Sequence, residues 1–234
     1  MKLTAAQIDR LYEFTRQHYV EWYDLQTELV DHLANAIEAQ WQENPKLDFE
    51  AALKKEFNKF GVFGFMDVVE KRQVALNKRY NNLIWMHFKT FFKIPQVFGV
   101  ILSTLLFAQT LRFIYFDGIF SALLLIGMTF SSVYAIKSTY QINRKKKENK
   151  KRWLFEEILN SYGSMSAFMS LPFYVLNTFF RFRETVLEKP IVLYILSLGI
   201  VMYYLAVYIV IKIIPAKAKE YLNETYPEYS LVNE

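Results

Sequence analysis

The chain has 234 residues and a net charge of +5, and 53% of its residues are hydrophobic, a share that suits a membrane protein. It contains no cysteine, which excludes a disulfide scaffold, a thiolate nucleophile and a Cys-ligated zinc site. Residues 1–70 carry 7 Lys/Arg against 13 Asp/Glu, whereas the remaining residues carry 21 against 10. The basic excess therefore belongs to the apolar part of the chain, where it serves membrane topology, and no nucleic-acid partner is expected.

Residues 1–75 predict a small cytosolic domain of three to four helices. Thr4 and Gln7 have the spacing of a capping box, so a first helix is expected to begin there and to run to about Gln17. A second helix is expected over residues 20–42, because apolar side chains recur at four-residue spacing until an Asn-Pro pair. Its buried stripe is expected to consist of Leu25, Leu29, Leu33, Ile37 and Trp41.

Two further helices are predicted before the first apolar run. Asp48 is expected to cap the third helix and Gly61 to follow its end, because aspartate accepts from first-turn amides and glycine adopts left-handed conformations. The fourth helix is expected to start near Phe65. Residues 76–93 then form a separate amphipathic juxtamembrane helix, whose aromatic rings and lysines suit the lipid headgroup layer.

The polar side of the second predicted helix is the best candidate for a site. It carries Glu28, Asp31, His32 and Asn35, a pattern that fits a solvated face, a partner-binding surface or a small metal site. The chain has no Ser/His/Asp order, no Gly-rich phosphate loop and no second carboxylate–histidine cluster. We therefore expect no catalytic residue, no metal and no cofactor, and we interpret the four residues as a surface for a cationic partner.

The same region carries a family resemblance. Residues 27–38 read Thr-Glu-Leu-Val-Asp-His-Leu-Ala-Asn-Ala-Ile-Glu, and the 49–59 helix and a Phe-Gly-Val-Phe-Gly-Phe turn follow. This arrangement resembles the HAAS-type helical domain, which precedes membrane spans in bacterial proteins and is often found beside PadR-type regulators. The resemblance covers residues 10–75, about a quarter of the chain. It implies a cytoplasmic signalling or regulatory module and supplies no catalytic residues.

Four uncharged apolar runs predict a four-helix transmembrane region over residues 94–214, followed by a tail, 215–234. The runs have 18 to 23 residues, and a helix of that length crosses a hydrocarbon layer of about 30 Å. None contains Asp, Glu, Lys, Arg or His, and such residues inside a membrane are the usual mark of an ion or proton pathway. Small residues at four-residue spacing, such as Gly99 and Ser103, are expected to let the helices approach closely. The four runs are residues 94–111, 118–136, 158–180 and 190–211.

The distribution of Lys and Arg predicts that both termini lie in the cytoplasm, and the resemblance implies that the membrane is a bacterial inner membrane. The segments next to the spans on the expected inner side carry 15 basic residues, against 4 in the two outer loops. Eight of the 15 lie in the loop 137–157, where a dense basic run is expected to contact the lipid surface or the acidic helix face. The run consists of Arg144, Lys145, Lys146, Lys147, Lys150, Lys151 and Arg152.

Together these patterns predict an all-α, multi-pass inner-membrane protein that acts through a protein partner and not as an enzyme. The leading hypothesis is a membrane-anchored signalling or regulatory protein whose N-terminal domain binds the partner. The alternative is an accessory or small permease subunit of a membrane transporter. The partner is then a regulator in the first case and a transporter subunit in the second, and the sequence is compatible with a homo-oligomer in both.

Overall fold

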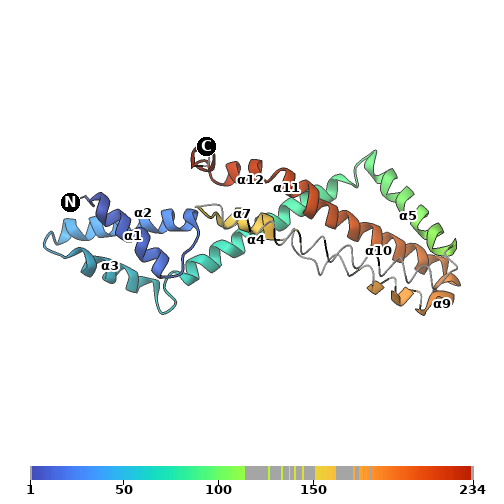
Figure 1. The fold of residues 1–234 in the computed structure, drawn as a ribbon, viewed down its shortest axis with the longest axis horizontal. Coiled ribbons are helices and arrows are strands. Elements are labelled where there is room, and N and C mark those ends of the chain that lie inside the picture. The colour runs from blue at the N-terminus through green and yellow to red at the C-terminus, as the bar shows by residue number, and fades with distance from the viewer. Residues whose placement is uncertain are drawn as a thin grey trace. The chain divides into compact units, whose positions relative to one another are not determined.

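A computed structural model of the chain describes residues 2–113, 151–161 and 181–232, with positions 126, 133, 137, 140, 144, 171, 174, 175 and 177–179. The described residues form helices and no strand, which confirms the all-α prediction (Figure 1). The chain divides into two compact units. The N-terminal unit comprises residues 1–79, 149–158 and 222–234, and the second unit comprises residues 80–148 and 159–221.

The first three helices of the N-terminal unit begin and end close to the predicted positions. Helix α1 (Ala5–Gln17) has the complete capping box, in which the Thr4 side chain accepts from the Gln7 amide and the Gln7 side chain accepts from the Thr4 amide. Helix α2 (Tyr23–Glu43) ends at Asn44, and α3 (Phe49–Phe57) is capped by Asp48, which accepts from the amides of two first-turn residues. Local sequence signals therefore set these boundaries.

The core of the N-terminal unit is built on the predicted apolar stripe of α2. All five stripe residues are buried, and Leu33 and Ile37 are completely inaccessible to solvent. Leu11 of α1 and the Ala52–Leu53 pair of α3 are buried as well, and α1 and α3 both pack against α2. A second cluster consists of rings in edge-to-face or tilted contact: Phe14, His18, Phe57, Phe60 and Phe65.

A tight turn over residues 61–64 joins the short 3₁₀ helix η1 (Asn58–Phe60) to α4 (Met66–Thr90). Gly61 and Gly64 have φ angles of +76° and +55°, in the left-handed region that favours glycine. A Cβ atom on Gly64 would lie 2.9 Å from the ring of Phe57, so this position also needs glycine for space. The turn leaves the side chains of Val62 and Phe63 97% and 71% exposed.

Helix α4 is longer than the sequence predicted. The predicted fourth helix and the separate amphipathic segment 76–93 form one helix of 25 residues, which ends at Thr90. No glycine or proline occurs between Met66 and Thr90, so no residue breaks the backbone hydrogen bonding where the two predicted segments meet. Three short helices further along the chain contribute residues to the N-terminal unit: α7 (Leu154–Ser161), α12 (Ala218–Thr225) and α13 (Tyr229–Val232).

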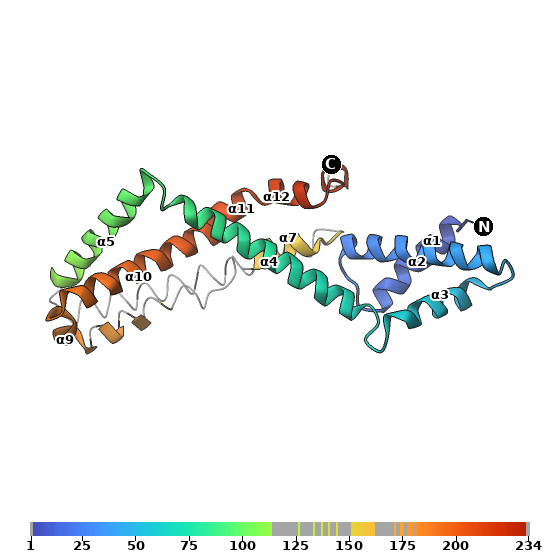
Figure 2. The same ribbon diagram turned by 180° about the vertical axis from the view of Figure 1, so that it is seen from behind.

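In the second unit, α5 (Gln96–Phe113) packs against α10 (Pro190–Tyr208), and both views of the ribbon show the two helices converging at their ends next to α9 (Figures 1 and 2). Helix α9 (Arg183–Leu187) precedes α10. The π-helical turn η3 (Ile209–Ile213) and α11 (Ile214–Ala216) continue α10. Pro215 has no amide to donate, and a local π turn accommodates the carbonyl that it leaves unpaired.

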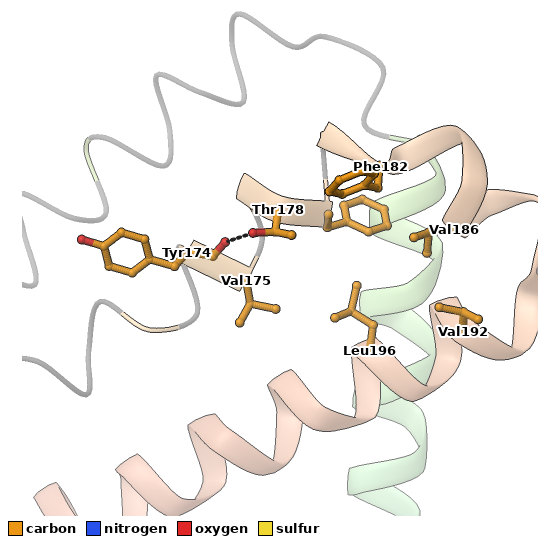
Figure 3. Close-up of a pocket in the computed structure, with 8 residues that line it drawn as sticks. Tyr174, Val175, Thr178, Phe182, Val186, Val192 and Leu196 are labelled. Atoms are coloured by element: carbon orange, nitrogen blue, oxygen red, sulfur yellow. Dashed lines mark hydrogen bonds between the residues drawn. The ribbon is translucent and has the colours of Figure 1, made fainter.

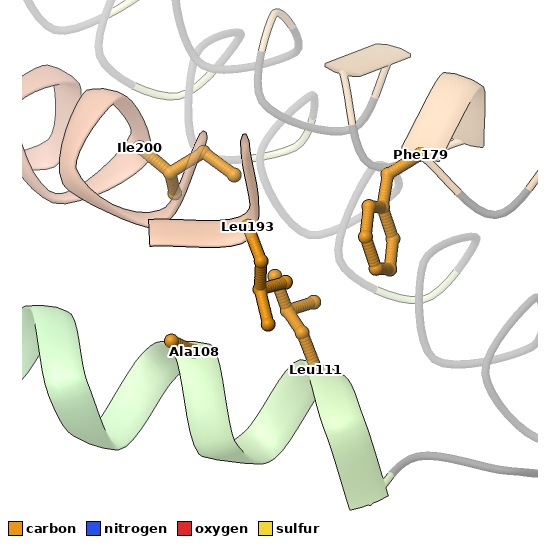
Figure 4. Packing of buried hydrophobic residues seen from close by; sticks show 5 residues of the cluster. All are labelled: Ala108, Leu111, Phe179, Leu193 and Ile200. Atoms are coloured by element: carbon orange, nitrogen blue, oxygen red, sulfur yellow. The ribbon is translucent and has the colours of Figure 1, made fainter. Parts of the chain in front are cut away.

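Small and apolar residues form the contact between α5 and α10. Ala108 and Leu111 of α5 pack with Leu193 and Ile200 of α10 and with Phe179 in a buried cluster (Figure 4). Gly99 and Ser103, which were expected to let helices approach closely, are exposed among the described residues and do not lie in this contact. The predicted runs 118–136 and 158–180 lie mostly outside the described residues, so the expectation remains a prediction for them. The buried residues of α5 are Val100, Thr104, Ala108 and Leu111, and the last two belong to the cluster with α10.

Two helices in the described part of the chain are long and apolar enough to cross a membrane. They are Gln96–Phe113, with a mean hydropathy of 1.3 over 18 residues, and Pro190–Ala216, with a mean hydropathy of 2.2 over its most apolar 18 residues. They correspond to the first and the last of the predicted spans. The run 118–136 and most of the run 158–180 lie outside the described residues, so the four-span region remains a prediction.

Candidate functional site

The predicted partner-binding residues lie on the outward side of α2. Glu28, Asp31 and Asn35 are exposed, and the described residues provide neither carboxylate with an ion-pair partner. These three side chains are therefore available to a second molecule. The structure brings them together on one face of one helix, as the sequence predicted.

His32 has a different environment. Its Nε2 atom lies 3.8 Å from Oε1 of Glu56, and its ring is edge-on to Phe60 with the centroids 5.8 Å apart. Glu56 is only 4% exposed, lies 2.6 Å from the Lys59 ammonium and accepts from Gln40 Nε2 at 3.3 Å. His32 thus covers a buried carboxylate between α2 and α3 and marks the edge of the exposed α2 face.

The exposed apolar turn begins at this edge. Phe60, which contacts His32, is followed directly by Gly61, Val62 and Phe63. An aromatic side chain held in solvent by a turn of fixed shape is a feature of partner-binding surfaces, where a few such residues supply most of the affinity. In the sequence these aromatic residues belong to the family pattern, and the two flanking glycines are the signal that could have indicated a projecting turn.

Three segments that are distant in sequence meet at Asp24, a residue in the first turn of α2 that the sequence analysis did not select. The Asp24 carboxylate is 8% exposed, and its Oδ1 accepts from the backbone amide of Leu154 at 3.1 Å. Its Oδ2 accepts from the hydroxyl of Tyr226 at 2.7 Å. We call Asp24, Trp153, Leu154 and Tyr226 the Asp24 junction.

The bond to Leu154 is a helix cap supplied by another part of the chain. Leu154 is the first residue of α7, so its amide is one of the donors that a helix leaves without an internal partner. A carboxylate next to the N-terminus of a helix also interacts favourably with the helix dipole. Asp24 therefore helps α7 to begin where it does, at the end of the predicted cytoplasmic loop.

Burial and charge shift the pKa values of both side chains in the junction. Burial raises the pKa of the Asp24 carboxyl above its ordinary value, while the hydrogen bonds from Tyr226 and Leu154 and the nearby Arg72 charge oppose the shift. Burial, the negative charge of Asp24 and their mutual hydrogen bond raise the pKa of the Tyr226 hydroxyl. Tyr226 therefore stays protonated near neutral pH and donates to the carboxylate.

Aromatic packing and ion pairs surround the junction. Trp153 is 1% exposed, and its ring contacts those of Tyr23, Tyr226 and Tyr229 at centroid distances of 5.3, 4.9 and 5.2 Å. Arg152 pairs with both Glu21 and Glu157, and Glu157 also accepts from the Trp22 indole at 3.0 Å. The junction is therefore a substantial contact and not a single hydrogen bond.

Two described residues of the basic run, Lys151 and Arg152, contact the start of α2. The Arg152 carbonyl accepts from the Tyr23 amide at 2.7 Å, and the Lys151 ammonium lies over the Tyr23 ring, 4.4 Å from its centroid. Arg152 thus pairs with Glu21 and not with the predicted acidic face at Glu28 and Asp31. Arg144 is exposed, and Lys145, Lys146, Lys147 and Lys150 lie outside the described residues.

The tail reaches the junction through α12. Tyr226 follows this helix directly, and Glu224 within it lies 3.4 Å from the guanidinium of Arg79 on α4. Arg79 also lies over the ring of Phe155, 5.6 Å from its centroid. The tail, the loop and α4 therefore share a second, polar contact beside the Asp24 junction.

The contacts described above hold the loop and the tail against helices α2 and α4. No group of three or more metal-ligating side chains occurs among them. No local pattern in the sequence indicates the Asp24 junction, because Asp24 is far along the chain from the Trp153–Leu154 pair and from Tyr226. No protein-family model, no curated protein and no solved structure matches the chain.

Proposed function

We propose that the chain is a multi-pass protein of a bacterial inner membrane whose cytosolic N-terminal unit acts as a regulatory module through a protein partner. The observation that carries this proposal is the Asp24 junction, which joins the loop and the tail to α2 of the N-terminal helices. A change in the membrane region that displaces the loop or the tail would alter the helix that the partner binds. This coupling fits a regulatory protein better than a passive anchor.

The composition of the N-terminal unit supports the four-span topology by a parity argument. Residues 1–79, 149–158 and 222–234 belong to one unit and therefore lie on one side of the membrane. One described span candidate separates residues 79 and 149, and another separates residues 158 and 222. After each of these spans the chain needs a second crossing to return to the side of the N-terminal unit. The uncharged runs 118–136 and 158–180 are long enough to provide the two crossings. The excess of Lys and Arg on this side assigns it to the cytoplasm.

The exposed chemistry of the unit suggests the kind of partner. Glu28 and Asp31 favour a partner with a cationic rim, and Phe63 with Val62 favours an apolar pocket beside that rim. Exposed ion pairs contribute only about 0–1 kcal/mol each, so the aromatic anchor would supply most of the affinity and the charges the choice of partner. The resemblance of residues 10–75 to the HAAS-type domain supports the regulatory role.

Site-specific photocrosslinking in native membranes tests the partner surface. A photoreactive residue at position 63 or 28 should give one discrete protein adduct, and the same residue at position 74 should not. Val74 is a matched control because its side chain is 61% exposed on α4. The adduct at position 63 should weaken when Glu28→Lys and Asp31→Lys are introduced together. Identical adducts at all three positions, or no effect of the charge reversal, would contradict the proposed surface.

Reporter fusions test the topology separately. Fusions after residues 115, 147, 186 and 234 should report outside, inside, outside and inside. A reporter after residue 234 that reads outside would refute the parity argument. The adduct's identity then decides between the two functions, because a transporter subunit would support the accessory-subunit alternative and a transcriptional regulator or kinase the regulatory one.

A further inference from the structure

The second unit contains an apolar hollow between α10 and the segment that precedes α9 (Figure 3). It has a volume of about 390 Å³, within the range of small-molecule and cofactor sites in proteins. Thr178 contributes a hydroxyl, but this group donates to the Tyr174 carbonyl at 3.0 Å, so it offers the hollow little polarity. The apolar wall consists of Val175, Phe179, Phe182, Val186, Val192 and Leu196.

Cationic residues are adjacent or close in the chain to residues of this wall. Arg181 and Arg183 flank Phe182, and the Arg183 guanidinium donates to the Arg112 carbonyl at the end of α5 at 3.4 Å. Lys189 precedes α10, and its carbonyl accepts from the amide of Val192 at 2.9 Å, which places it one turn from that lining residue.

Two carboxylates, Glu184 and Glu188, lie on or next to α9 at the same end. The described residues here therefore carry four cations and two anions. Since the cations are in excess beside an apolar hollow, this end of the unit is suited to a ligand with an anionic head and a hydrocarbon chain.

We infer that the hollow is a specific site for an anionic phospholipid, with one acyl chain against Phe182, Val192 and Leu196 and the phosphate near Arg181 and Lys189. The inference rests on the membrane embedding in the proposed function and not on the protein partner. Pro190 begins α10 beside these residues, so the hollow lies where a spanning helix meets the headgroup layer. A lipid at this position would brace α9 against α10.

Native mass spectrometry of the full chain in a non-ionic detergent tests the site, with phosphatidylglycerol and phosphatidylcholine of identical acyl chains as probes. One phosphatidylglycerol should remain bound at low lipid-to-protein ratios, in preference to phosphatidylcholine. Leu196→Trp fills the hollow and should lower its occupancy about tenfold or more. Ile195→Trp is the matched control, because Ile195 is adjacent in sequence and 65% exposed.

A second variant tests the headgroup contact without changing the hollow. Arg181→Gln with Lys189→Gln should weaken phosphatidylglycerol binding by about fivefold per cation and remove the preference over phosphatidylcholine. If lipid binds in variable number and Leu196→Trp behaves like Ile195→Trp, or if the headgroups bind equally well to the wild type, the inference is wrong. Reporter fusions that deny the membrane topology would instead contradict the proposed function.

Discussion

Replacing Tyr226 by phenylalanine should release the C-terminal tail from the N-terminal unit. The substitution removes one hydroxyl and leaves a ring that still fits against Trp153, whose centroid is 4.9 Å away. It deletes the 2.7 Å hydrogen bond to the buried Asp24 carboxylate. The N-terminal core is unchanged, so the effect should be confined to the junction.

The expected magnitude follows from the charge and burial of the acceptor. A hydrogen bond to a charged group contributes about 1.5–3 kcal/mol, and every 1.4 kcal/mol is a factor of ten in an equilibrium. The opening equilibrium of the tail should therefore increase about 10- to 100-fold. Asp24→Ala should cost more, because it leaves both the Tyr226 hydroxyl and the Leu154 amide without their shared acceptor.

Hydrogen exchange measured by mass spectrometry on the full chain in detergent is the appropriate assay, since it reports local opening. Tyr226→Phe should speed exchange in peptides from the tail, residues 222–232. Asp24→Ala should speed exchange in the same peptides and in those from residues 151–158. Tyr19→Phe is the control, because it removes a hydroxyl from a side chain that is 76% exposed.

The double variant gives a further check. Asp24→Ala and Tyr226→Phe remove the same hydrogen bond, so their combined effect should be smaller than the sum of their separate effects. Tail exchange in Tyr226→Phe that matches Tyr19→Phe, or strict additivity in the double variant, would refute the claim that this bond holds the tail.

Three further predictions concern the N-terminal unit. Gly64→Ala should destabilise it by about 1–3 kcal/mol in urea unfolding and Gly61→Ala by less, because both positions have positive φ but only Gly64 lacks space for a Cβ; equal losses would contradict the role of Phe57. Leu33→Asp should lower the free energy of unfolding by several kcal/mol, since Leu33 is completely buried, and should make the unit more sensitive to proteolysis than the wild type. Burial raises the pKa of Asp24 above its ordinary value of 3.8, so the folded junction binds a proton more tightly than the unfolded chain. The contribution of Asp24 to the free energy of unfolding should therefore fall as pH rises from 3.8 through the raised pKa, and it should be constant above that pKa. The difference in unfolding free energy between the wild type and Asp24→Asn across this range should show that slope, and a difference independent of pH would contradict it.

Features that depend on a few neighbouring residues could be predicted from the sequence. The Thr4 capping box, the Asp48 cap and the apolar stripe of α2 each follow from local spacing, and the structure contains all three. The face of α5 that packs on α10 could not be predicted, because α5 is apolar on every side and its periodicity therefore distinguishes no face. The contact uses Ala108 and Leu111, whereas Gly99 and Ser103 are exposed.

The Asp24 junction was missed for a different reason. Its two hydrogen bonds join residues 130 and 202 positions apart, and neither end carries a local pattern that identifies the other. Asp24 alone is indistinguishable in sequence from the solvated acidic residues that follow it on α2. The predicted site residues Glu28, Asp31 and Asn35 share one exposed face because helical spacing alone determines that property.

The distance between Asp24 and Tyr226 along the chain also sets an order of assembly. At about 5–20 residues per second, the ribosome needs about 10 to 40 s to make the 202 residues that separate them. During that interval the N-terminal helices are already made, and Asp24 lacks the Tyr226 hydroxyl, which is its last hydrogen-bond donor to be synthesised. A chain that stops before residue 226 would lack this donor. The junction is therefore completed only late in synthesis, after the residues of both described span candidates have been made.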